Sequence, residues 1–387
     1  MNKKFKKLFT LATSLVASLG IGCVSYAATI DHTGKAETPT GDNTITIARE
    51  LVLNSSDGGN VTVYAPSITY TYELSAGDAT TEGDIEIKAG DVSYLATGSR
   101  ATVRSEYTNS DSATSGNKVN KPISFTFNPD AFPSAGIYRY KLNETATSVN
   151  PTSIGITRDK NYVTVKYLDV YVTNGDTAGE KKITGYVLWN SIDPSIDPQD
   201  KKSPGWSEVY NVYTLQITKN ITGALADKTA EFPFKVTLNG QLSSAKLDTD
   251  GTLNVGSSTT PYTVTGNLGD NGTMYISGIP TTVTFDIGEK NPTADVYKAT
   301  ATARGIDTGA TLERNKSIDK NTADYVAVVE GAAKTTIDAN ALITVTNELD
   351  SPSPTGVILY FAPYILIGGL AVLLLVISVK SKKRVQA

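Results

Sequence analysis

Apolar and polar residues alternate in short runs along the middle of the chain. Such runs occupy residues 44–47, 68–72, 124–127, 162–165, 232–236, 282–285 and 342–345. A period of two in segments rich in β-branched and aromatic residues predicts half-buried strands. Turn signals such as Asn239-Gly240 and Asp250-Gly251 separate the runs. Many short strands with such turns predict an all-β chain of antiparallel sandwiches rather than βαβ units.

One arrangement of polar strand ends occurs twice in this pattern. A cation, a Glu and an Asn each end a predicted strand, and an aromatic strand follows about twenty residues after the cation. The first set is Arg49, Glu144 and Asn211, and the second set is Lys219, Glu289 and Asn347. The repeat predicts two tandem domains, 28–212 and 213–350, joined by a short and stiff connection.

The first 27 residues have the pattern of a secretory signal peptide. A basic segment, Lys3–Lys7, precedes an apolar stretch, Leu8–Val24, and Ser25-Tyr26-Ala27 is a cleavage site of the A-x-A kind. The rival interpretation is a lipobox with Cys23 as the lipidated residue. Gly20 then stands where a large aliphatic residue is expected, which favours the signal peptide and export.

The last part of the chain, residues 351–387, predicts a membrane segment. Val357–Val379 is uncharged and long enough to span a bilayer, and Lys380–Arg384 would stay in the cytoplasm. A permanent single-pass anchor is one interpretation. The other is a sortase cell-wall sorting signal, which this order of motif, apolar span and basic tail resembles. Only Pro354-Thr355-Gly356 fits the usual Leu-Pro-x-Thr-Gly motif, and cleavage between Thr355 and Gly356 is expected.

Composition and charge exclude several classes of function. The chain has one Cys and one His, so a disulfide framework, a zinc site, haem and a Cys or His nucleophile are not expected. We expect no metal and no cofactor. The net charge is −4, and removing the eight terminal cations leaves −12. An acidic core argues against nucleic-acid binding.

The second set of polar strand ends can carry chemistry if its members face inward together. Charged and amide residues flank strands in every β protein, which is the ordinary explanation. If Lys219 and Asn347 lie buried beside Glu289, however, desolvation lowers the lysine pKa and raises the glutamate pKa. A neutral amine is a nucleophile, and a protonated carboxyl can polarise the Asn347 amide. Attack would expel ammonia and leave a Lys–Asn isopeptide bond.

Several segments carry a resemblance to one family. They are Leu215–Gly223, Phe285–Glu289, Val345–Asn347, Pro354–Val357, Ala362–Ile365, Gly136–Glu144 and Val187–Asn190. With them the chain resembles the streptococcal T-antigen (FctA-type) backbone pilins over nearly all of its mature length. The resemblance implies two Ig-like, CnaB-type sandwiches, each with an isopeptide bond. It also implies that Lys219 and Asn347 are bonded in the second domain and that Glu289 is the catalytic acid.

The first domain departs from the family at Arg49, which stands where the family has Lys. A guanidinium stays protonated and cannot be the nucleophile. We expect an Arg49–Glu144 ion pair in its place, with Asn211 hydrogen-bonded to it.

The family also polymerises through a lysine that precedes the last strand of the first domain. Lys202 is the favoured candidate and Lys201 the second, in a polar loop that should be exposed. Both can equally be ordinary surface charges, and Lys181 and Lys182 are the next candidates.

These observations predict a secreted, wall-anchored backbone pilin rather than an enzyme. Its chemistry would be one self-crosslinking event, and its partners sortase, other copies of itself, minor pilins and peptidoglycan. One alternative is a monomeric sortase-anchored adhesin or stalk. Another is an exported hydrolase with a carboxylate pair, although no glycosidase-like or Ser/His arrangement is visible.

Overall fold

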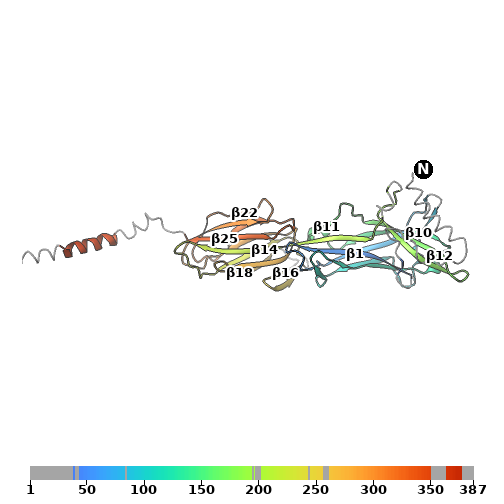
Figure 1. Cartoon of the computed structure of the whole chain (residues 1–387), viewed down its shortest axis with the longest axis horizontal. Coiled ribbons are helices and arrows are strands. Elements are labelled where there is room, and N and C mark those ends of the chain that lie inside the picture. Colours follow the sequence, from blue (N-terminus) through green and yellow to red (C-terminus); the bar gives the residue numbers. More distant parts are fainter. Residues whose placement is uncertain are drawn as a thin grey trace, which may run out of the picture.

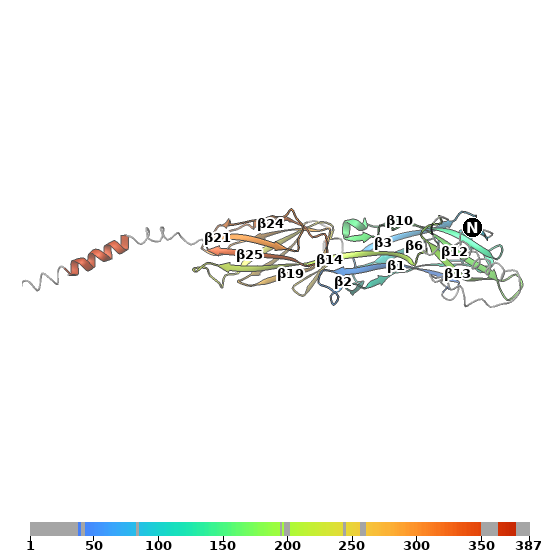
Figure 2. The same ribbon diagram turned by 45° about the horizontal axis from the view of Figure 1, so that its top comes forward.

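Two β-sandwiches follow each other along the chain and lie end to end, which makes the molecule elongated (Figure 1 and Figure 2). The computed structural model describes residues 38–39, 43–82, 85–193, 196, 202–242, 245–255, 261–349 and 363–376. The prediction of an all-β fold with tandem Ig-like sandwiches is confirmed.

The first sandwich packs two layers of strands face to face. One layer has the order β13-β12-β10-β3-β6, with β5 beside β10 and β4 beside β5. The other layer is formed by β1, β8, β9, β11 and the first half of β14, and β2 pairs with β7. The strands are β1 Thr44–Ser55, β2 Thr62–Tyr64, β3 Ile68–Ala76, β4 Thr80–Glu82, β5 Ile85–Ala89, β6 Thr102–Tyr107, β7 Ser112–Thr114, β8 Lys118–Asn120, β9 Ile123–Thr126, β10 Gly136–Thr147, β11 Ile156–Arg158, β12 Val165–Asn174, β13 Lys181–Trp189 and β14 Gly205–Thr222. Within the described residues, three short 3-10 helices connect them: η1 Val92–Tyr94, η2 Pro129–Ala131 and η3 Pro151–Ile154.

The second sandwich repeats this plan. Its first layer has the order β18-β15-β20-β24-β22, and its second has β17-β16-β19-β14-β25-β21-β23. The strands are β15 Phe232–Asn239, β16 Lys246–Thr249, β17 Thr252–Val255, β18 Tyr262–Leu268, β19 Thr273–Pro280, β20 Thr284–Glu289, β21 Tyr297–Arg304, β22 Thr311–Leu312, β23 Lys316–Ile318, β24 Val326–Ala332 and β25 Ala341–Leu349.

A single strand, β14, belongs to both sandwiches. Its first half pairs in parallel with β1, and its second half pairs in parallel with β25. The two hydrophobic cores divide between Val212 and Tyr213, which are neighbours within this strand. The strand crosses the joint without a loop, although its register with β19 shifts between Tyr213 and Leu215, so the sandwiches are joined by a strand rather than by a flexible linker.

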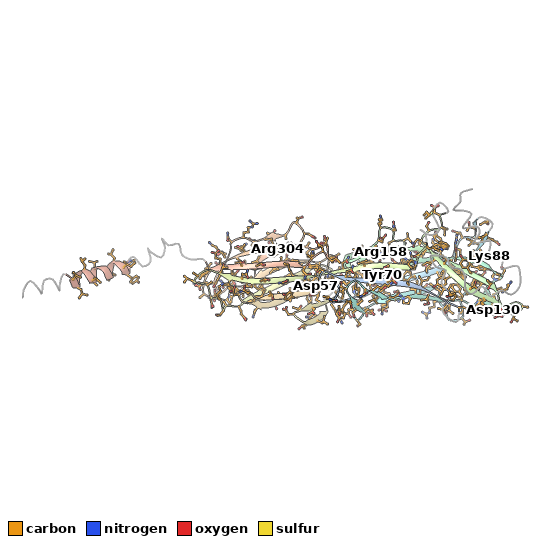
Figure 3. The ribbon with its side chains drawn as sticks, viewed as in Figure 1. Asp57, Tyr70, Lys88, Asp130, Arg158 and Arg304 are labelled. Carbon is orange, nitrogen blue, oxygen red and sulfur yellow. The ribbon has the colours of Figure 1, made fainter. Side chains whose placement is uncertain are left out.

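Hydrogen bonds between polar side chains also connect the two sandwiches across this joint. Ser56 Oγ donates to Asn340 Oδ1 at 2.6 Å, and Asn340 Nδ2 donates to Asp57 Oδ1 at 2.7 Å. Asp57 marks this junction in Figure 3. Because Asn340 comes from the second sandwich and Ser56 and Asp57 from the first, these hydrogen bonds hold the two sandwiches in one relative orientation.

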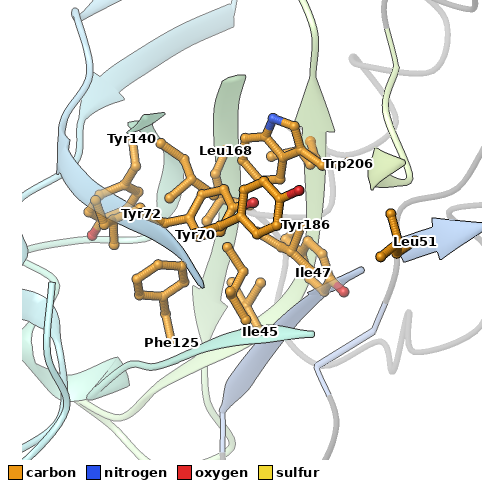
Figure 4. Packing of buried hydrophobic residues seen from close by; sticks show 14 of the residues in the cluster. Ile45, Ile47, Leu51, Tyr70, Tyr72, Phe125, Tyr140, Leu168, Tyr186 and Trp206 are labelled. Atoms are coloured by element: carbon orange, nitrogen blue, oxygen red, sulfur yellow. The ribbon is translucent and has the colours of Figure 1, made fainter. Parts of the chain in front are cut away.

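Aromatic side chains dominate the core of the first sandwich. Tyr70, Tyr72 and Trp206 lie together between the layers (Figure 4), with the Tyr72 and Trp206 ring centroids 4.7 Å apart. Buried aromatic rings remove large apolar areas from water, and Tyr and Trp bring a polar group that needs a partner. The core therefore places hydroxyl groups next to the buried charges described below.

The two ends of the chain are described only in part. Residues 363–376 are helical with exposed side chains, and no helix among the described residues is long and apolar enough to cross a membrane. The predicted signal peptide 1–27, the predicted cleavage residues Thr355 and Gly356, the basic tail, and the rest of the predicted span 357–379 lie outside the described residues. Those assignments stay predictions.

Candidate crosslinking site

The second sandwich brings Lys219, Glu289 and Asn347 together in its core. Lys219 lies on β14 and pairs with Val345 of β25, so Asn347 stands two residues further along the adjacent strand and on the same face. Glu289 ends β20 in the opposite layer. All three residues have 0% exposure, so no water shields their polar groups from one another.

The three functional groups meet at one carboxylate oxygen. The Nζ atom of Lys219 lies 2.6 Å from Oε1 of Glu289, and Nδ2 of Asn347 donates to the same oxygen at 2.8 Å. Glu289 Oε2 and Asn347 Oδ1 are buried and make no hydrogen bond within the described part of the chain, while Lys219 Nζ contacts Glu289 Oε1 as an ion pair. Buried polar atoms without partners are costly, so this cluster is under-satisfied as three separate side chains.

Apolar surroundings favour the neutral forms of both Lys219 and Glu289. The Lys219 Nζ atom lies 4.6 Å from the ring centroid of Phe232 and 5.7 Å from that of Phe234. Burial lowers the pKa of Lys219 to about 8, with Glu289 opposing that change. Burial also raises the pKa of Glu289. A proton moved from the lysine to the glutamate leaves an amine, a carboxylic acid and a carboxamide in contact, which are the groups that amide exchange requires.

The first sandwich holds Arg49 at the position that corresponds to Lys219. The correspondence follows from register, because Arg49 on β1 pairs with Trp206 of β14 just as Lys219 pairs with Val345. Two residues further along the adjacent strand, the position of Asn347 is therefore taken by Glu208. The Arg49 guanidinium contacts the Glu208 carboxylate, and both side chains are fully buried.

The expected Arg49–Glu144–Asn211 cluster is thus wrong in two of its contacts. Glu144 lies in the same region, but Arg158 is its cationic partner, with Nη2 donating to Oε1 at 2.7 Å. Asn211 lies on the other face of β14, where it accepts from Asn54 at 3.3 Å and donates to Thr157 at 3.4 Å. A separation of three residues from Glu208 places it on the opposite side of the strand.

Hydroxyl groups complete the charged cluster of the first sandwich. Tyr70 donates to Glu208, while Tyr72 and Tyr162 donate to Glu144. Arg158 also donates to Glu208 and so links the two carboxylates. Although burial opposes its charge, Tyr72, Tyr70 and Glu208 hold the pKa of Arg49 above its usual value. Two guanidiniums and two carboxylates therefore form one cluster of ion pairs and hydrogen bonds, in which the buried Arg49 Nε makes no hydrogen bond within the described residues; Tyr70 and Arg158 are labelled in Figure 3.

The aromatic residues beside the two sites differ by one oxygen atom. Tyr72 pairs with Glu144 across β3 and β10, as Phe234 pairs with Glu289 across β15 and β20. A phenol donates to a carboxylate and favours its ionised form, whereas a phenyl ring only removes water. The tyrosines thus suit a permanent ion cluster, and the phenylalanines suit neutral, reactive groups.

The candidate acceptor Lys202 lies beside the edge strand of the first sandwich. It forms an antiparallel bridge with Trp189 at the end of β13, and burial lowers its pKa. Lys201 lies outside the described residues. Lys181 and Lys182 are at the other end of β13, where the backbone N–H of Lys181 donates to Asp130 Oδ1 at 3.2 Å.

Sequence reasoning missed a buried lysine, Lys166 on β12. Its amine contacts the carboxamide oxygen of Asn190 and donates to Ser203 Oγ at 2.9 Å. Burial lowers the pKa of Lys166 to about 8, with Glu144 opposing the change. The signal available in the sequence was its place in the alternation of β12, where it stands among inward-facing residues.

Comparison with known proteins identifies relatives along almost the whole chain. The chain is 24% identical over 364 residues to a curated pilin of Streptococcus pyogenes serotype M1, covering 91% of this chain and 94% of the relative. Two major pilin structures from S. pyogenes each cover 80% of this chain. One has 23% identity and a TM-score of 0.45 over 100% of its own length, and the other 17% and 0.47 over 99%. A domain of unknown function (DUF7601) matches residues 213–324. The resemblance to the streptococcal backbone pilins is therefore confirmed by a relative that matches this chain from one sandwich to the other.

Proposed function

We propose that this chain is the backbone subunit of a sortase-assembled pilus and that its second sandwich is closed by a Lys219–Asn347 isopeptide bond. The similarity to a streptococcal pilin supports the role of a pilus subunit. The crosslink is carried by one observation, the fully buried contact of amine, carboxyl and carboxamide at Glu289 Oε1.

The proposed reaction exchanges one amide for another. The neutral Nζ of Lys219 attacks Cγ of Asn347, a C–N bond forms, and Nδ2 leaves as ammonia. Glu289 first protonates the amide oxygen, then accepts a proton from Nζ and passes it to the leaving nitrogen. When ammonia leaves, the carbonyl oxygen returns its proton to Glu289, so the acid ends as it began. Rotation of the Asn347 carboxamide by half a turn brings Oδ1 to the acid, which can then donate to it. No cofactor enters the balance.

This chemistry runs once in each molecule, so the protein is structural rather than an enzyme. The bond joins β14 to β25, which run in parallel at the centre of their sheet. A pull along the fibre then loads a covalent bond instead of unzipping strands. A chain without disulfides gains the same protection that a disulfide gives to other exported proteins.

Anchoring is proposed to use the Pro354-Thr355-Gly356 motif. Sortase would cleave after Thr355 and transfer its carbonyl to an amine of the next subunit or of peptidoglycan. Mass spectrometry of wall-released protein should find Thr355 as the last residue or joined to a lysine. Full-length protein that retains 357–379 in the membrane fraction as the main species would instead indicate a permanent anchor.

Polymerisation is proposed to use Lys202 as the acceptor. Lys202→Arg keeps the charge but removes the nucleophilic amine, so the high-mass ladder on a denaturing gel of wall extracts should collapse to monomer. Lys201→Arg is the matched control and should keep the ladder. A full ladder from Lys202→Arg would move the acceptor to Lys201, Lys181 or Lys182. A single band from the wild type would favour a monomeric anchored stalk.

A further inference from the structure

A chain of buried polar contacts in the first sandwich ends at Trp189, the bridge partner of Lys202. Arg139 on β10 and Asp169 on β12 stand opposite each other and form a bidentate pair, with both hydrogen bonds at 2.7 Å. Trp189 on β13 donates from Nε1 to Asp169 Oδ2 at 2.8 Å. Three adjacent strands therefore fix the orientation of one indole ring.

The burial of the Arg139–Asp169 ion pair calls for an explanation, because burying charges costs free energy. The side chains of Arg139 and Asp169 are 2% and 3% exposed. Apolar residues of similar size commonly give equal or better stability than a buried ion pair, while geometric specificity is a use that such pairs serve well. What this pair orients is the ring of a residue at the edge of the sheet, because β13 is the last strand of its layer.

Lys202 is held against that ring from two sides. Its Nζ lies 5.8 Å from the centroid of the Trp189 ring, within the range of a cation–π contact. The next residue, Ser203, is fixed by its backbone N–H, which donates to Leu188 O at 2.9 Å, and by the buried amine of Lys166. Backbone, ring and hydroxyl together hold Lys202 in one defined place against the end of the edge strand β13.

We propose that Trp189, oriented by Asp169 and Arg139, is a positioning residue that presents the Lys202 amine for acyl transfer and selects it over the adjacent Lys201. This inference rests on the proposed function, in which Lys202 is the acceptor of Thr355. It assigns to the indole a role in transfer rather than in core packing, because an amine held in one place meets the Thr355 acyl group in one geometry, which speeds the transfer.

The test is the position of the linkage in wall polymers made by full-length variants. Trp189→Leu removes the ring, Trp189→Phe keeps a ring without its N–H, and Asp169→Asn keeps an acceptor for the indole while removing the charge. Ile183→Ala is the matched control, since it opens a core contact on the same strand far along β13 from Lys202. Peptide mapping gives the ratio of Lys202 to Lys201 linkages, and gels give the amount of polymer.

We expect wild-type polymers to be joined at Lys202. Trp189→Leu should lower polymer yield by about tenfold and shift part of the remaining linkages to Lys201, because the amine is no longer held in place. Trp189→Phe keeps a ring but loses the bond to Asp169, and Asp169→Asn keeps an acceptor but loses the charge pair with Arg139, so both should fall between the wild type and Trp189→Leu in yield and in Lys202 preference. Ile183→Ala should lower the melting temperature of the first sandwich but keep the linkage ratio of the wild type.

Three outcomes would overturn the inference, and they are distinguishable. If Trp189→Leu keeps the wild-type yield and linkage ratio, Trp189 has no positioning role although Lys202 remains the acceptor. If yield falls equally in Trp189→Leu and Ile183→Ala with an unchanged ratio, the ring acts on stability alone. If wild-type polymers are joined at another lysine, the proposed acceptor fails together with this inference.

Discussion

Recombinant protein spanning residues 28–355 should be lighter than its sequence by the mass of one ammonia. The second sandwich has a buried amine and a buried carboxamide that share one acid, so it should react as it folds. The first sandwich has a guanidinium and a carboxylate in the corresponding places, so it should not. Digestion should release one branched peptide that joins Lys219 to Asn347.

Loss of this bond should have a large effect on stability. The bond closes a loop of about 128 residues, for which chain-entropy arithmetic gives about 5 kcal/mol. For a domain of this size that corresponds to a fall of roughly 15 °C in melting temperature. Lys219→Ala, Glu289→Ala and Asn347→Ala should each restore the full mass and show such a fall for the second sandwich.

Two comparisons separate the bond from the loss of packing. Lys316→Ala removes an exposed lysine of the same sandwich. This variant should still be one ammonia lighter than its own sequence and should keep the melting temperature of the wild type. Glu289→Gln keeps the size and the hydrogen-bonding groups of the acid but cannot shuttle a proton, so it should retain the full mass. Wild-type protein at full mass, without the branched peptide, would overturn the crosslink and leave the pilin similarity as the remaining support for the proposed function.

The sequence was sufficient to predict the residues of the second site because each stands in a recognisable alternating run, although only Glu289 ends its strand, while Lys219 and Asn347 lie inside β14 and β25. Lys219, Glu289 and Asn347 all follow clear alternation and have turns or polar residues beyond them. The aromatic pair Phe232 and Phe234 was visible in the same way. What the sequence could not give was the shared oxygen at which the three groups meet, since that depends on the distance between two layers.

The first sandwich was harder to predict because β14 does not end where its polar residue suggests. Analogy with Asn347 predicts a strand end at Asn211, but the strand continues to Thr222 and enters the other sandwich. The alternation of β14 indicates which residue enters the core, because Trp206, Glu208 and Tyr210 face inward and Asn211 faces outward. The register between β1 and β14 makes Glu208 the partner of Arg49. These two residues are 159 positions apart, so no local sequence pattern indicates that they meet.

Local structure also shifted two predicted strands. The run 162–165 is coil up to Val165, because Tyr162 closes a turn by donating from its backbone to Asp159 O at 2.9 Å and uses its hydroxyl on Glu144. The run 282–285 starts two residues late, at Thr284, after a turn closed by Val283 and Pro280. In both places a hydrogen bond of the turn prevailed over β propensity.

The charged cluster of the first sandwich should be convertible into a second crosslink by three substitutions. Arg49→Lys supplies an amine, and Glu208→Asn supplies a carboxamide two residues past its register partner, as in the second sandwich. Arg158→Gln removes the cation that pairs with Glu144, and a buried carboxyl without a cationic partner has a raised pKa. The triple variant then has the amine, the acid and the amide that the native second site has.

The triple variant should lose the mass of two ammonia molecules rather than one, and a second branched peptide, joining the new side chains at positions 49 and 208, should appear. Closing this loop is worth about 5 kcal/mol by the same chain-entropy arithmetic. Three of the four charged residues are replaced together, and Glu144 alone stays without a cation, which costs free energy. Because the gain from the closed loop offsets this cost, the first sandwich should melt at least as high as in the wild type.

Arg49→Lys alone is the matched control and should lose one ammonia, since Glu208 has no amide nitrogen to expel and keeps the new amine protonated. Adding Glu144→Ala to the triple variant should abolish the second loss, which identifies Glu144 as the acid. A folded triple variant that loses only one ammonia would show that strand register and charge are not sufficient to form the second crosslink. The hydroxyl groups of Tyr72 and Tyr162 would then be the remaining difference, because they donate to Glu144, whereas Oε2 of Glu289 has no hydrogen-bond partner within the described residues.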